Sequence, residues 1–200
     1  APNLYAMDQY VVTPMSKPGA CAAREHDRKN TVPQTMVQTS FSELLNAHGL
    51  YVHCFVSHFW GHFYSKTLQS LRLWSENNFE RMGCEQVKAM VFWICLFALN
   101  QHDVAEEVGD NPFQGPFNAA LAQAEAAVMI LDEQIHPFKR IWCLFEVHRL
   151  GELHKPFELI CEVGSLSQPG ERSSDEAALD QMMKATCRAL WKMSAHEAEA

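Results

Sequence analysis

The sequence predicts an α/β domain, a three-layer sandwich in which helices flank a central parallel sheet of four to five strands. The first observation is that short apolar runs alternate with helical patterns along the chain, which is typical of parallel sheets. The second is that these runs are continuously apolar, as expected for strands buried on both faces. The predicted strands are residues 51–57, 87–99, 128–132 and 157–163, and for the second of these runs a helical lead-in stays open.

Helical patterns fill the intervals between these runs. Ser40 and Glu43 have the spacing of a capping box, so a helix is expected to begin there and to end before Gly49. Apolar residues at helical spacing predict an amphipathic helix from Tyr64 to about Asn77. Further helices are expected over 117–127, from about 140 to 153, and from 173 to about 190.

The chain divides into an arm, one domain and a short tail. Residues 1–38 contain four prolines and no sustained periodicity, which predicts an extended or partly ordered arm. Residues 39–192 form the α/β domain, a length sufficient to bury a substantial core. Residues 193–200 are expected to fray.

Composition excludes two classes of partner. The net charge is −8, and no run of five basic residues occurs, so binding to a nucleic-acid backbone is not expected. The longest apolar run, residues 89–99, is too short to cross a bilayer, so no membrane span is expected.

Cysteine usage indicates a reducing compartment. The seven cysteines are odd in number and show no CxxC spacing, and several lie inside apolar runs where a free thiol acts as a small hydrophobe. We therefore expect an intracellular, cytoplasmic location. Because the first residue is Ala rather than Met, a missing targeting segment and an organellar location stay open.

Glu146 is the leading candidate for a functional side chain. It lies between Phe145 and Val147, and a carboxyl among apolar groups is costly unless it is paired or used. Its helix follows the predicted strand 128–132, and open α/β sheets build their sites at the carboxyl ends of strands. The alternative is a surface or half-buried acid paired with Arg140 or Arg149 of its own helix.

Other chemistries have weaker support. His53, His58 and His62 lie close in sequence, but a strand followed by a loop does not place them as metal ligands, and we expect no metal site. Cys143 has no evident base partner, so it is not expected to be a nucleophile. Asp132, at the end of a predicted strand, is more simply a capping acid. Neither GxGxxG nor a P-loop motif occurs, which disfavours dehydrogenases and P-loop enzymes.

Three motifs together resemble a known family. FVSHFWG at 55–61, the helix and strand at 117–132, and IWCLFEV at 141–147 are similar, in order and spacing, to segments of Toll/interleukin receptor (TIR) domains. The likeness covers roughly residues 50–165 and is nearest to plant-type and protist members with a WCxxE helix. It implies a flavodoxin-like fold. The sequence NQHD at 100–103 departs from the family's usual loop, and residues 1–49 have no counterpart.

The resemblance also implies an activity, because many TIR domains cleave the nicotinamide–ribose bond of NAD with the glutamate of that helix. The matching residue is Glu146. A carboxylate is suited to an oxocarbenium-like transition state, and nicotinamide leaves as a neutral molecule, so no strong acid is needed. NAD is then the substrate, and no cofactor is expected. The expected substrate-binding residues are Ser57, Phe59, Trp60, Gly61, His102, Asp103 and Trp142.

The alternative function is a non-catalytic TIR-like module that binds a protein partner or a second copy of itself. The long segment before the domain favours this alternative, because arms without a core of their own often wrap a partner. Both functions remain open at the level of the sequence.

Overall fold

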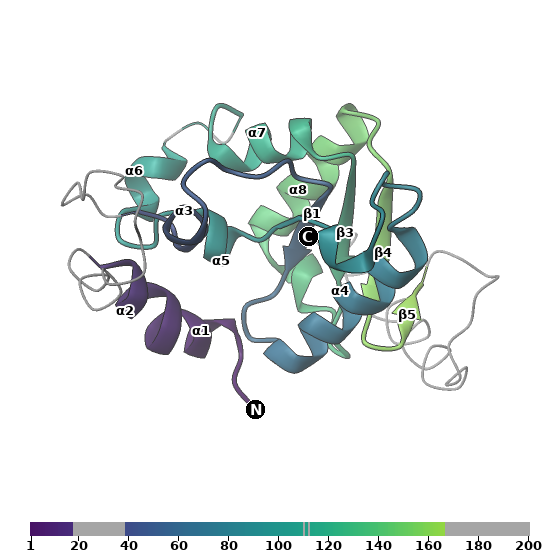
Figure 1. The fold of residues 1–200 in the computed structure, drawn as a ribbon, viewed down its shortest axis with the longest axis horizontal. Helices are drawn as coiled ribbons and strands as arrows, with labels where there is room; N and C mark the ends of the chain where they lie inside the picture. The colour runs from purple at the N-terminus through teal and green to yellow at the C-terminus, as the bar shows by residue number, and fades with distance from the viewer. Residues whose placement is uncertain (18–38, 110, 112, 167–200) are drawn as a thin grey trace, which may run out of the picture.

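The computed structural model describes residues 1–17, 39–109, 111 and 113–166 (Figure 1). It contains one five-stranded sheet with the strand order β2-β1-β3-β4-β5. The strands are β1 (Cys54–His58), β2 (Phe92–Trp93), β3 (Ala126–Ile130), β4 (Phe157–Cys161) and β5 (Gly164–Ser165). Strands β1 to β4 run parallel, and β5 is antiparallel to β4. The predicted α/β fold with a largely parallel sheet is therefore confirmed.

The strand order has a reversal between β1 and β3. The chain runs from β1 outward to β2 on one side and then returns to build β3 and β4 on the other. In doubly wound sheets, ligands bind beside the carboxyl ends of the strands where the order reverses. Here that point lies where His58 and Ile130 pair at the ends of β1 and β3.

Helices cover both faces of the sheet (Figure 1). Because side chains alternate along a strand, Val56 packs on α4 (Tyr64–Asn78) with Leu71 and Trp74. Phe55, one residue earlier, packs on the opposite face, which is covered by α7 (Pro116–Gln123) and α8 (Ile141–Glu152). Ser57 has the same parity as Phe55 and therefore faces α8.

The predicted second strand is mostly wrong, although the helical lead-in is present. Within residues 87–99 the chain forms a 3₁₀ turn (Val87–Ala89), the two-residue β2, and then helix α5 (Cys95–Ala98). Part of this run is buried by contacts outside the sheet. Leu96 is fully buried and packs with Leu4 and Val12. Continuous apolarity thus indicated burial correctly and the strand incorrectly.

Most other predicted elements are confirmed with shifted ends. Helix α3 (Phe41–Leu45) has the expected capping box, in which the Ser40 side chain accepts from Glu43 N and Ser40 N donates to the Glu43 carboxylate. Two further short helical segments are α6 (Val104–Val108) and a 3₁₀ turn, His136–Lys139. Among the described residues no helix is long and apolar enough to cross a membrane.

The start of the chain is helical rather than extended. It forms α1 (Leu4–Met7), a π-helical segment (Asp8–Val12) and α2 (Thr13–Ser16), which lie beside α3 and α5 (Figure 1). Leu4 and Val12 are fully buried against Leu96, and this contact explains why the segment folds. Residues 18–38, the predicted helix at 173–190 and the predicted tail at 193–200 lie outside the described residues.

Candidate functional site

The candidate site lies at the carboxyl ends of β1 and β3, where the strand order reverses. Ser57 and His58 end β1, and Asp132 follows β3 by two residues. Helix α8 places Glu146 against this end of the sheet. The site therefore combines two loops with one helix, the arrangement that an open parallel sheet provides.

Glu146 occupies a core position on α8. The buried residues of this helix are Cys143, Glu146 and Leu150, a spacing of three and four that defines one helical face. The Glu146 side chain is only 4% exposed, and its Oε2 has no hydrogen-bond partner among the described residues. Burial raises the pKa of Glu146 to about 8, while the nearby Ser57 hydroxyl and the Arg140 charge oppose that rise. Near neutral pH the carboxyl is therefore largely protonated.

Ser57 lies between Glu146 and Cys143. Its hydroxyl is close enough to lower the pKa of both groups, yet Ser57 Oγ completes a hydrogen bond with neither. Burial, followed by the Glu146 charge, raises the pKa of Cys143 to about 11, so its thiol stays neutral. The thiol donates to His58 O at 3.7 Å. This environment does not activate Cys143 as a nucleophile.

His58 is a second buried group with an unused atom. Its Nδ1 donates to Val56 O at 3.2 Å, whereas its Nε2 has no hydrogen-bond partner among the described residues. Burial lowers the pKa of His58 to about 4, so the ring is neutral at physiological pH. An unsatisfied buried polar group costs about 1–3 kcal/mol. Ser57, His58 and Glu146 each carry such a group, as do Trp74 and Glu162 elsewhere among the described residues, and a catalytic role is one explanation for an unsatisfied group.

Arg140 supplies the positive charge of the site. It precedes α8, is half-buried, and its guanidinium lies 5.9 Å from the centre of the Phe59 ring. Within the described part of the chain it forms no ion pair with Glu146. Arg149 instead donates to Asn118 at 2.7 Å and to Glu152 at 2.8 Å. The structure thus does not place Glu146 in an arginine ion pair at the surface.

Phe59 is held by the loop that follows β3. Its ring stacks on His136 with 4.5 Å between centroids, and the Asp132 carboxylate accepts from His136 N at 2.8 Å and pairs with the His136 ring. Ile135, between them, has φ 47°, a strained value for a β-branched residue. A Cβ at Gly61 would lie 2.4 Å from Phe59 ring atoms, so a side chain there would push the ring off His136.

The N-terminal helices engage two of the predicted substrate-binding residues. The Trp60 ring makes an edge contact with Tyr5, at 5.5 Å between centroids, and its indole N–H donates to Cys95 Sγ at 3.3 Å. The Ser16 hydroxyl donates to Val12 O, so it accepts from His102 Nε2 at 3.0 Å. Trp60 and His102 thus both contact residues 4–16, and Trp60 also contacts Cys95, whose pKa is raised by burial and by the Glu146 charge.

The other two predicted residues lie at the periphery. Asp103 is exposed and precedes α6. Trp142 is 38% exposed and stacks on Phe117 of α7, with 5.5 Å between centroids. The structure therefore gathers Ser57, Phe59 and Gly61 around the Glu146 end of the sheet and gives Trp142 a packing contact on α7.

Sequence reasoning missed the contribution of three residues. Arg140 was considered only as an ion-pair partner, and the roles of His136 and Cys95 were not anticipated. The pair Asp132 and His136 carried a usable signal, because an acid followed four residues later by a histidine after a strand is a common loop-fixing arrangement. Cys95 had no such signal, because its contact with Trp60 joins residues 35 positions apart.

Comparison of the chain with protein-family models, with curated proteins and with solved structures finds no match. The likeness to TIR domains therefore rests on the three sequence motifs alone. Among the described residues no group of three or more His, Cys, Asp or Glu side chains is placed to hold a metal ion.

Proposed function

We propose that this chain is a TIR-like, nucleotide-binding domain that cleaves the nicotinamide–ribose bond of NAD, with Glu146 as the catalytic carboxylate. One observation carries the proposal: a buried carboxyl with an unpartnered oxygen lies where the strand order reverses. Burying such a group is costly for folding, and a tuned acid in this position is typical of a functional site.

The raised pKa of Glu146 fits this reaction once NAD is bound. With a pKa of about 8, about a tenth of the carboxyl groups are ionised at pH 7. The nicotinamide ring of NAD is a cation, and a cation a few ångströms away lowers the pKa of a carboxyl. Substrate binding therefore favours the carboxylate, which stabilises the positive charge that develops on the ribose as the bond breaks. Nicotinamide leaves as a neutral molecule with the electron pair of the C–N bond, and water adds to the ribose carbon and releases a proton to the solvent.

The neighbouring residues have matching roles. The unpartnered hydroxyl of Ser57 provides a hydrogen bond to a ribose hydroxyl beside Glu146. The stacked rings of Phe59 and His136 provide an aromatic surface for a base, and Arg140 beside them provides charge for a phosphate. Trp60 contributes only when the contact with Tyr5 opens.

Nicotinamide release from NAD tests the proposal. The full chain is incubated at high concentration with NAD and the products are separated by chromatography, beside Glu146→Gln and the matched variant Glu152→Gln. Glu152 lies on the same helix but is exposed and bound to Arg149. We expect turnover in the wild type and in Glu152→Gln, and a loss of about 10²- to 10³-fold in Glu146→Gln. No release by the wild type, or equal release by both variants, would refute the assignment.

A second candidate function is assembly with another copy of the chain. Helix α8 exposes Ile141 (76%), Leu144 (40%) and Trp142, beside the exposed Phe113, and exposed apolar groups of this kind mark interaction surfaces. Under this function we expect the wild type to form dimers in sedimentation experiments and Ile141→Lys to be monomeric. A monomeric wild type at the concentration of the NAD assay excludes self-assembly through this face.

A further inference from the structure

We propose that Cys84 is a second reactive site, at which small uncharged carbon electrophiles form a thioether and His53 stabilises the attacking sulfur. The site lies at the amino end of β1, and Glu146 lies near the opposite end. The inference is independent of NAD cleavage, because the two sites share no residue.

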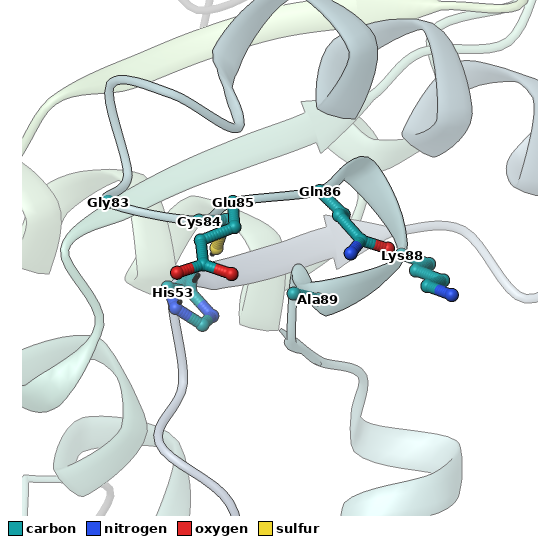
Figure 2. A pocket seen from close by; sticks show the side chains of 7 residues that line it. All are labelled: His53, Gly83, Cys84, Glu85, Gln86, Lys88 and Ala89. Atoms are coloured by element: carbon teal, nitrogen blue, oxygen red, sulfur yellow. Dashed lines mark hydrogen bonds between the residues drawn. The ribbon is translucent and has the colours of Figure 1, made fainter.

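A pocket of about 530 Å³ opens at this end of the sheet (Figure 2). His53, which directly precedes β1, lines it together with the segment that follows α4, including Cys84, Glu85, Gln86 and Lys88. The pocket thus brings a thiol, an imidazole and two charged groups together. The volume suffices for a ligand of a few heavy atoms.

The hydrogen bonds of His53 determine which nitrogen carries its proton. The backbone N–H of Val91 donates to His53 Nδ1 at 3.1 Å, so Nδ1 is an acceptor. His53 N in turn donates to Val91 O at 3.0 Å, which fixes the backbone at this point. The ring proton of the neutral imidazole is therefore on Nε2, which lies 3.4 Å from Cys84 Sγ. His53 accordingly donates to the sulfur, and this bond is strongest when the sulfur is a thiolate.

The other cysteines of the described residues have less favourable surroundings. Cys54 and Cys161 are fully buried in the core, and Cys143 is 3% exposed. Burial raises the pKa of each of these thiols and raises that of Cys95 to about 12. None of the four lines the pocket. Cys84 is itself buried, at 9% exposed, and its thiol donates to Met82 O at 3.9 Å, but it is the described cysteine that both lines the pocket and accepts from a histidine N–H.

Charge in the pocket indicates the class of electrophile. Figure 2 shows the Glu85 carboxylate on the same side of the pocket as His53 and Cys84, and Lys88 extending to the other side. A negative charge beside the sulfur repels anionic reagents and leaves neutral ones unaffected. In the alkylation by iodoacetamide, the sulfur forms a bond to the CH₂ carbon and iodide leaves with the electron pair of the C–I bond. The proton of the thiol goes to water.

Alkylation of the native full chain with iodoacetamide tests the proposal. Peptide mass spectrometry measures the alkylation of each cysteine over time, so that the rates at Cys21 and Cys187 are distinguished from the rate at Cys84. We expect Cys84 to react at least ~10-fold faster than Cys54, Cys95, Cys143 and Cys161. Equal rates at Cys84 and at these four would overturn the proposal.

Two variants separate the roles of the neighbours. In His53→Ala, alkylation of Cys84 is expected to slow while the four core cysteines stay unreactive; an unchanged rate at Cys84 contradicts the role of His53. If the core cysteines become reactive, the His53→Ala variant has unfolded. The Glu85→Gln variant then tests the proposal in its place. In Glu85→Gln the rate with iodoacetate, relative to iodoacetamide, is expected to rise several-fold at Cys84. An unchanged ratio means that the reagent does not meet Cys84 in this pocket, which overturns the site.

Discussion

Glu146→Gln is expected to be more stable than the wild-type protein above pH 8, by on the order of 5 kcal/mol in the free energy of unfolding. Folding raises the pKa of Glu146 from 4.5 to about 8 because the carboxyl becomes buried. Between these values the folded state holds a proton that the unfolded state releases, so stability falls as pH rises through this window. The slope is about 1.4 kcal/mol per pH unit. Glutamine is neutral at every pH, so the Glu146→Gln variant does not lose this stability as pH rises.

The pH range in which the effect of Glu146 can be measured is set by His58, whose titration changes the free energy of unfolding in the opposite direction. Burial lowers its pKa from 6.5 to about 4, so its contribution to stability is present above pH 6.5 and is lost as pH falls toward 4. Below pH 6.5 the two slopes therefore oppose each other. Between pH 6.5 and 8 the free energy of unfolding changes with the titration of Glu146 and not with that of His58. Urea unfolding across this range measures that change.

The comparison with Glu152→Gln isolates the effect. Glu152 lies on the same helix but is exposed, and Arg149 lowers the pKa of Glu152, so its titration falls below the measured range. The free energy of unfolding of Glu152→Gln is expected to fall with pH as in the wild type, whereas that of Glu146→Gln does not fall. Parallel stability curves for the wild type and Glu146→Gln from pH 6.5 to 8.5 would show that Glu146 is not buried in solution.

Leu4→Ala is expected to lower the free energy of unfolding by about 2–5 kcal/mol, the usual cost of removing a fully buried leucine side chain. Leu4 is 0% exposed and packs with Val12 and Leu96. Its backbone N–H also donates to Trp60 O at 2.9 Å, which ties the segment to the end of β1. The start of the chain therefore belongs to the folded core, and chemical denaturation measures the loss.

Leu68→Ala is the matched control. Leu68 lies on α4 with 47% of its surface exposed, and alanine is a good helix former, so the expected change is within about 0.5 kcal/mol. An equal, small effect of both substitutions would mean that residues 4–16 do not pack on the domain.

The parallel sheet could be predicted from sequence because its strands are buried on both faces. That burial makes β3 wholly apolar and leaves β1 and β4 mostly apolar, with Ser57, His58 and Glu158 as their polar residues, so local reasoning detects the runs. The inward position of Glu146 could also be predicted from the sequence, because Cys143, Glu146 and Leu150 share one helical face. Both features depend on local periodicity.

Features that depend on distant contacts could not be predicted in this way. Within the apolar run 87–99, Leu96 meets Leu4 and Val12 of the N-terminal helices, a contact invisible to a local pattern. The approach of Ser57 to Glu146 likewise requires the placement of α8 against β1. Prolines in residues 1–38 indicated irregular structure, yet Pro14 lies in the first turn of α2, where proline is tolerated.

The central claim is that Glu146 is a buried carboxyl whose pKa falls when NAD binds beside it. The most direct measurement is a pH titration of its side-chain carboxyl by ¹³C NMR, with the signal assigned by its absence in Glu146→Gln. We expect a midpoint of about pH 8 in the free protein, and a lower midpoint with a non-hydrolysable NAD analogue, because the nicotinamide cation favours the carboxylate. A midpoint near the ordinary value of 4.5 that the analogue does not change would contradict the claim.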